Sequence, residues 1–135
     1  MGSRPRCIKI INEQSGEILP ATSWLTVGKT YPVLAVFVAA NGLPKYRLLG
    51  DDEVTPALHT ANQFETLSGI LPSIWRAHSV PNRYFELAPA SWIVSGFWEA
   101  FFDGNPDAVR VFHEDYRTLL QEAADEGLGQ KKNSP

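Results

Sequence analysis

A run of three consecutive carboxylates is the feature of this sequence that most resembles a catalytic or metal-binding group. Asp51, Asp52 and Glu53 follow one another in the chain, and clustered carboxylate oxygens can ligate a hard cation such as Mg²⁺ or serve as general acid and base. The same residues are typical of a solvated hairpin turn, where an Asp side chain bonds the local backbone. Because adjacent acids in a turn point in divergent directions, we expect no catalytic or metal-ligating role. Both a plain turn and a contact with a partner molecule stay open.

Other residue types that carry chemistry are scattered along the chain. There is no Gly-rich phosphate loop, no G-x-S-x-G and no H-E-x-x-H. The three histidines, His59, His78 and His113, show no metal-ligand spacing. Cys7 has no histidine near it in sequence, which favours a small buried hydrophobe. We therefore expect no enzyme activity, no cofactor and no metal site.

Negative charge is concentrated in one segment near the carboxyl terminus. Residues 1–98 hold eight basic and seven acidic side chains, whereas residues 99–126 hold two basic and eight acidic ones, an excess of six negative charges. Arg110 can pair with Asp107 and Glu114 at helical spacing, but most of these acids lack such a partner and must face water or a basic molecule. The net charge of −3 argues against the broad basic face that direct nucleic-acid binding needs.

Length and composition limit the class of protein. With 135 residues and 44% hydrophobic side chains, the chain fits a single domain, 1–135, that can bury a core without disulfides. The longest apolar run, YPVLAVFVAANGL, is too short to span a membrane, and no basic, apolar and small-residue leader stands at the start. We expect a cytoplasmic protein without membrane contact, ordered over about residues 7–127, with flexible ends at 1–6 and 128–135.

Strands make up most of the framework that must position these side chains. Apolar and alternating runs bounded by turn residues predict strands over residues 7–11, 31–40, 45–50, 55–60, 62–67, 73–79 and 84–89. A hairpin is expected across residues 50–53 and a second turn at residues 80–83. Strand alternation places Trp75 on the side opposite Arg76 and His78, which predicts that Trp75 is buried.

Two helices are expected after the strands. A short helix is predicted over residues 96–102, capped by Ser95 and ended by the turn at residues 103–104. In the long helix, Asn105 is a good N-cap, Pro106 fits the first position and Gly127 fits a C-terminal stop. The fold is therefore predicted to be α+β: a small, strongly curved antiparallel sheet, or a partly open SH3-like barrel, packed by a short and a long helix.

Four large aromatic residues gather in the short helix. Phe97 and Phe101 share one helical face, and Trp98 and Phe102 share another, about 100° away. Trp92 is expected to pack beneath this helix. Either all four enter the core, or at least one stays partly exposed, Trp98 first among them, and an exposed aromatic beside unpaired acids is typical of a binding anchor. The candidate partner-binding residues are Asp51, Asp52, Glu53, Trp98, Glu99, Asp103, Asp107 and Glu114.

Three segments together resemble small bacterial proteins of the immunity-protein type: VGKTYPVLAV, KYRLLGDDEVTPALHTANQFETL and GFWEAFFDGNPDAVRVFHEDY. In those proteins a curved sheet with a D-D turn precedes a G-F-W-E-x-F-F-D-G-x-P segment and an acidic helix. The resemblance covers roughly residues 24–120 and consists mostly of turn and core signatures. It implies a protein that binds and neutralises a cognate bacterial toxin. The acidic carboxyl-terminal surface of the chain would then contact a basic surface of the toxin and cover the toxin's active site.

Two other functions stay open. The concave side of the sheet could hold a small ligand or substrate, with Tyr31, Tyr46, His59 and Tyr84 around a pocket, as in the mouth of a β-barrel. Alternatively, the chain could be a general adaptor for an unrelated protein. A pocket with converging titratable groups would favour the ligand-binding or enzymatic alternative over the toxin inhibitor.

Overall fold

The computed structural model describes residues 4–67 and 71–132, with side chains described for residues 4–67 and 71–125. The predictions of flexibility for residues 1–3 and 133–135 lie outside these ranges. Residues 128–132, expected in a flexible tail, continue the last helix instead.

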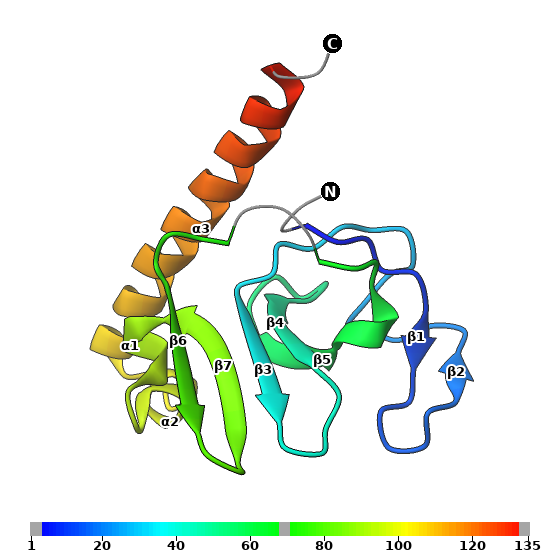
Figure 1. Cartoon of the computed structure of the whole chain (residues 1–135), viewed down its shortest axis with the longest axis horizontal. Helices are drawn as coiled ribbons and strands as arrows, with labels where there is room; N and C mark the ends of the chain where they lie inside the picture. Colours follow the sequence, from blue (N-terminus) through cyan, green and yellow to red (C-terminus); the bar gives the residue numbers. More distant parts are fainter. Residues whose placement is uncertain (1–3, 68–70, 133–135) are drawn as a thin grey trace.

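A five-stranded antiparallel sheet organises the described residues (Figure 1). In spatial order its strands are β5 (Pro56–Thr60), β4 (Lys45–Leu49), β3 (Ala35–Ala39), β7 (Tyr84–Pro89) and β6 (Trp75–Val80). A second sheet contains β1 (Ile10–Ile11) and β2 (Ile18–Leu19). The main sheet ends at β5 and at β6 and does not close into a barrel. The α+β class predicted from the sequence is confirmed.

The two predicted hairpins are both present. β4 and β5 pair from Lys45 opposite Thr60 to Leu49 opposite Pro56, and β6 and β7 pair along six positions that end at the turn of residues 80–83. β3 joins the hairpins because it pairs with β4 on one side and with β7 on the other. The central ladder of the sheet therefore links residues 36–39 to residues 84–87.

The strand predicted over residues 62–67 is wrong, since a 3-10 helix, η1 (Ala61–Gln63), starts this segment. The Gln63 side chain is buried, and its Oε1 accepts a hydrogen bond from the Ile11 amide at 3.1 Å while its Nε2 donates to Thr60 Oγ1 at 3.1 Å. A side chain thus replaces bonds that a strand ladder would have made. The strand expected over residues 7–11 is likewise reduced to β1 and an isolated bridge at Cys7.

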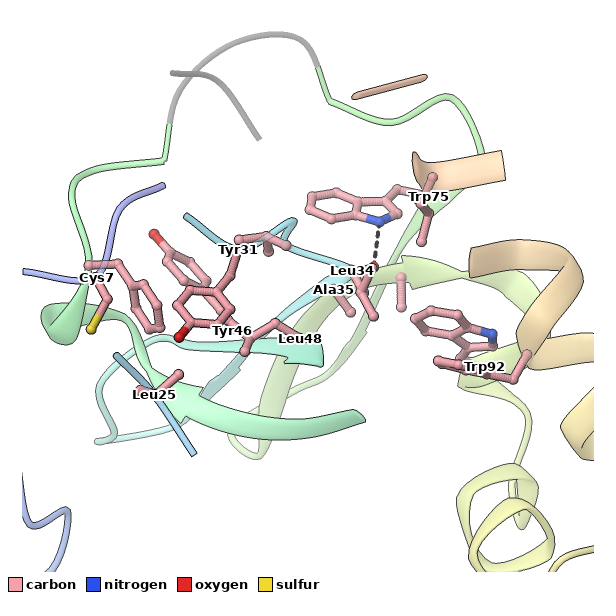
Figure 2. Packing of buried hydrophobic residues seen from close by; sticks show 14 of the residues in the cluster. Cys7, Leu25, Tyr31, Leu34, Ala35, Tyr46, Leu48, Trp75 and Trp92 are labelled. Carbon is pink, nitrogen blue, oxygen red and sulfur yellow. Dashed lines mark hydrogen bonds between the residues drawn. The ribbon is translucent and has the colours of Figure 1, made fainter. Parts of the chain in front are cut away.

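The core lies on both faces of the sheet. Tyr46 and Leu48 pack with Leu25 and Cys7 of the amino-terminal segment (Figure 2). Ala35 pairs with Arg47 and is buried on the opposite face, and Figure 2 draws Trp92 at the end of the cluster away from Cys7. As predicted, Trp75 is buried, and its Nε1 donates a hydrogen bond to the Leu34 carbonyl at 2.8 Å.

Three helices follow β7: α1 (Ala90–Ile93), α2 (Phe97–Phe102) and α3 (Pro106–Lys132). The Asn105 cap of α3 is confirmed, because its Oδ1 accepts the amides of Asp107 at 3.0 Å and Ala108 at 3.2 Å. The segment around Trp92 forms α1. No helix in the described chain has the length and apolar character that crossing a membrane requires.

Two predicted helix ends are wrong. Gly96, at φ +85°, occupies the N-cap of α2 in place of Ser95, and α2 has no side-chain cap. α3 passes through Gly127 without ending. A glycine inside a helix costs only about 1 kcal/mol relative to alanine, which a long helix can tolerate.

Candidate functional site

Asp51 holds the loop that precedes β3 against the turn between β4 and β5. Its carboxylate accepts hydrogen bonds from Thr26 Oγ1 at 2.7 Å, the Tyr31 hydroxyl at 2.8 Å and Lys29 Nζ at 3.0 Å. Burial by itself would raise the pKa of Asp51, but these donors and the Lys29 charge outweigh it and lower the pKa. Burial and the hydrogen bond to Asp51 raise the pKa of Tyr31 to about 12. A partner group at Asp51 would have to displace three internal donors.

Asp52 and Glu53 complete the same turn in different ways. Asp52 Oδ1 accepts the amides of Val54 at 3.0 Å and Thr55 at 3.1 Å, and hydrogen bonds from Thr55 and Val54 lower the pKa of Asp52. This is the local turn chemistry expected of an aspartate. Glu53, at φ +59°, instead lines a cavity together with Tyr116 of α3. Within the described residues no three His, Cys, Asp or Glu side chains gather as a metal site would require.

The connection between α2 and α3 displays an aromatic side chain among acids. We call Glu99, Phe102, Asp103 and Asp107 the acidic corner. Phe102 is 55% exposed, and Glu99 and Asp103 are exposed and have no ion pair or side-chain hydrogen bond within the described part of the chain. The Asp107 side chain is 90% exposed and lies 3.9 Å from Arg110. The Asp103 amide donates to the Glu99 carbonyl at 3.0 Å, which fixes the backbone of the corner.

Other acids of α3 are occupied by the protein itself. Glu114, a predicted contact residue, pairs with Arg110 at 3.1 Å. Asp115 accepts a hydrogen bond from the Ser91 hydroxyl at 2.9 Å. Glu122 accepts the Ser73 amide at 2.8 Å and also the Ser73 hydroxyl. Among the acids of α2 and α3 whose side chains the structure describes, those without an internal partner therefore gather at the corner.

Trp98 lies between the two alternatives that the sequence left open, a core position and a partly exposed one. It is partly buried against the core, with Trp92 at 5.4 Å and Phe97 at 5.0 Å between ring centroids. The Arg47 guanidinium lies 4.0 Å over its ring. At least one of the four aromatic residues does stay exposed, as one of the two alternatives had it: Phe102 is the most exposed of them, because α2 turns the Trp98 ring towards the sheet. The predicted burial of Trp92 is confirmed at 3% exposure.

Arg47 belongs to a polar cluster that sequence reasoning missed. Its Nη1 donates to the Pro56 carbonyl at 2.6 Å, and burial lowers its pKa to about 10 against the opposing charge of Glu86. Burial raises the pKa of Glu86 above its ordinary value, although the charges of His78 and Arg47 oppose this effect. His78 Nδ1 lies 3.7 Å from Glu86 Oε1. The alternation of KYRLL marks the face that Arg47 occupies, but nothing in it shows that α2 covers that face.

The four polar residues expected around a ligand pocket do not share one open surface. Tyr31, Tyr46 and His59 are 2%, 8% and 8% exposed and belong to the buried interior. Burial lowers the pKa of His59 below its ordinary value, although the charges of Glu13 and Asp52 oppose this effect. Strand register places Tyr84 on the opposite face of the sheet from Tyr46.

Six of the eight predicted contact residues form two groups, whereas Trp98 and Glu114 are engaged inside the protein. One is the acidic corner, and the other is the turn of residues 51–53, which lies beside Tyr116 in α3, about 13 Å along the helix from Asp107. Comparisons of the chain with models of known protein families, with curated proteins and with solved structures give no match. The geometry and the charges of these two groups thus have to carry the functional inference.

Proposed function

We propose that the chain is a stoichiometric inhibitor that binds a basic protein and covers its functional site, as the immunity proteins that its sequence resembles do. The observation that supports this proposal is the acidic corner, where a 55% exposed phenylalanine stands beside Glu99 and Asp103, which have no ion pair within the described residues. A large apolar side chain with a charged surround has the composition of a binding hot spot. Such an inhibitor acts in the cytoplasm of the producing cell.

The uneven charge of the chain favours a basic target. Residues 99–126 carry an excess of six negative charges, and opposite potentials on two surfaces accelerate their encounter. An enzyme that acts on nucleic acid or on a nucleotide presents a basic surface around its active site. A toxin of that class is therefore the target that the corner suits best.

Because immunity proteins are made beside the toxin that they neutralise, co-expression with the product of the neighbouring gene tests the proposal. We expect a 1:1 complex in size-exclusion chromatography with light scattering, and growth of cells that the neighbouring gene product alone would kill. A neighbouring product that neither binds the chain nor harms the cell would contradict the proposal. Binding without relief of toxicity would contradict the inhibitor function and would favour a general adaptor instead.

A matched pair of charge reversals tests the role of the corner in that complex. Asp103→Lys should lower the association rate about ten-fold at low salt and flatten its salt dependence, because attraction between opposite surfaces speeds encounter. Glu17→Lys makes the same change of charge at an exposed site near β2 and should change the rate by less than about two-fold. Stopped-flow fluorescence at several salt concentrations measures both. Equal effects of the two reversals would show that net charge, and not the corner, guides association.

A further inference from the structure

A cavity of about 110 Å³ separates α3 from the turn between β4 and β5. Its walls include the apolar side chains of Pro32 and Leu49, the ring of Tyr116 and the carboxylate-bearing Glu53. It therefore lies where the acidic turn meets the acidic helix, between two segments that the sequence singles out separately. A lysine or arginine side chain is of a size that such a cavity can accept.

The charges around this cavity are unequally satisfied. Lys29 also lines it, but its Nζ is held by Asp51 at 3.0 Å. Glu53 has no ion pair or side-chain hydrogen bond within the described residues. The pKa of the Tyr116 hydroxyl is raised, chiefly by burial. The charge of Arg4 acts to lower this pKa, and the charge of Glu53 acts to raise it. Glu53 is thus the charge on the wall that an incoming group can neutralise.

The backbone at Glu53 adds to this picture. Its φ of +59° lies in the left-handed region, which costs a residue with a side chain about 1–2 kcal/mol and which glycine or asparagine adopts more readily. A glutamate occupies the position in spite of that preference. Glu53 nevertheless lines the cavity.

We propose that this cavity is the socket for a basic side chain, lysine or arginine, of the protein that the chain binds. The methylene groups of that side chain would pack between Pro32, Leu49 and the Tyr116 ring, and its head group would meet the Glu53 carboxylate. A cation beside an aromatic ring and a carboxylate gains from both. The identity of the partner rests on the proposed function, whereas the socket can be tested without it.

Nuclear magnetic resonance of the full ¹⁵N-labelled chain tests the socket with two small probes of matched shape. Propylguanidinium carries the head group of arginine, and propylurea is its neutral counterpart. We expect propylguanidinium to shift the amide signals of Leu49, Glu53 and Tyr116 in a saturable way, and propylurea to leave them in place. Equal shifts with both probes, or shifts spread over the whole acidic surface, would overturn the proposal.

Two variants locate the effect. Glu53→Gln keeps the shape of the side chain and removes its charge, so the saturable shifts should be lost. Asp103→Asn removes one charge at the acidic corner and should leave the titration unchanged. Retention of the shifts in Glu53→Gln would overturn the socket, and their loss in Asp103→Asn would assign them to the overall potential.

The socket and the proposed function can fail independently. If propylguanidinium binds as expected but the neighbouring gene product does not, the inhibitor is wrong and the socket stands. If the target binds Glu53→Gln as tightly as the unaltered chain while Asp103→Lys binds it more slowly, the inhibitor stands and the socket is not part of its interface, which overturns the proposal.

Discussion

Asp51 shows how a residue that resembles a reactive group can be structural. Asp51→Asn removes the charge that Lys29 and the Tyr31 hydroxyl address, and hydrogen bonds to a charged group contribute about 1.5–3 kcal/mol each. Allowing for solvent, since the Asp51 side chain is 23% exposed, we expect a loss of about 2 kcal/mol in the free energy of unfolding at pH 7. Urea denaturation followed by circular dichroism measures it.

The sign of the pH dependence follows from the lowered pKa of Asp51. Because the folded pKa lies below the ordinary value of 3.8, the stabilisation is complete above that value and is lost as the pH falls through the folded pKa. The difference between the chain and Asp51→Asn should therefore shrink below about pH 4. Asp52→Asn, which keeps the Oδ1 acceptor for Val54 and Thr55, is the control and should lose less than about 0.5 kcal/mol. Equal losses in the two variants at pH 7 would show that Asp51 is not the anchor.

At the scale of elements, the turn after β4 depends on one close approach. A Cβ atom on Gly50 would lie 2.6 Å from the Trp24 carbonyl oxygen, and the adjacent Asp51 amide donates to that same oxygen at 2.8 Å. Gly50→Ala should therefore push the loop at Trp24 away and lower the free energy of unfolding by about 2–3 kcal/mol. Thermal denaturation by calorimetry measures the change.

Gly42 supplies the matched glycine. A Cβ there would meet Ala39 Cβ at 3.4 Å, an ordinary contact, and alanine restricts the unfolded chain more than glycine does. Gly42→Ala should leave stability unchanged or raise it slightly. A Gly50→Ala variant as stable as Gly42→Ala would show that the loop and the turn are not held together as described.

Elements with a local cause could be predicted from the sequence, and those with a distant cause could not. Asn105 and Pro106 specify the start of α3 through adjacent backbone groups, and the turn at residues 80–83 does so for its hairpin. Gln63 replaces a strand with η1 by bonding Ile11, 52 residues away, which no local pattern contains. The exposed ring of α2 is Phe102, because the orientation of α2 depends on its packing against the sheet.

The same limit applied to the candidate site. The acids of the corner could be found because their excess over basic residues is visible in composition. The socket could not be found, because Glu53 and Tyr116 are 63 positions apart in the numbering and meet only after α3 has folded back. Likewise, the hydrogen bonds that Thr26, Lys29 and Tyr31 donate to the Asp51 carboxylate depend on the path of the loop before β3.

For the whole molecule, stability and binding should be separable. Leu119 is 4% exposed, so Leu119→Ala should lower the free energy of unfolding by about 2–4 kcal/mol and leave target affinity unchanged below the melting temperature. Phe102 is largely outside the core, so Phe102→Ala should cost less than about 1 kcal/mol of stability and weaken the complex by about 2 kcal/mol or more. Calorimetric melting and titration calorimetry on the same samples measure both quantities. Parallel losses in both variants would contradict a displayed anchor.

The ladder between β3 and β7 also determines when the sheet can be completed during synthesis of the chain. β3 can meet β4 early, but its second edge has no partner until β7 has been made, 45 positions after Ala39. At ordinary rates of translation that interval lasts on the order of a few seconds. During it, a strand rich in valine has one row of amides and carbonyls unpaired. The nascent chain is therefore most in need of a chaperone between the synthesis of these two strands.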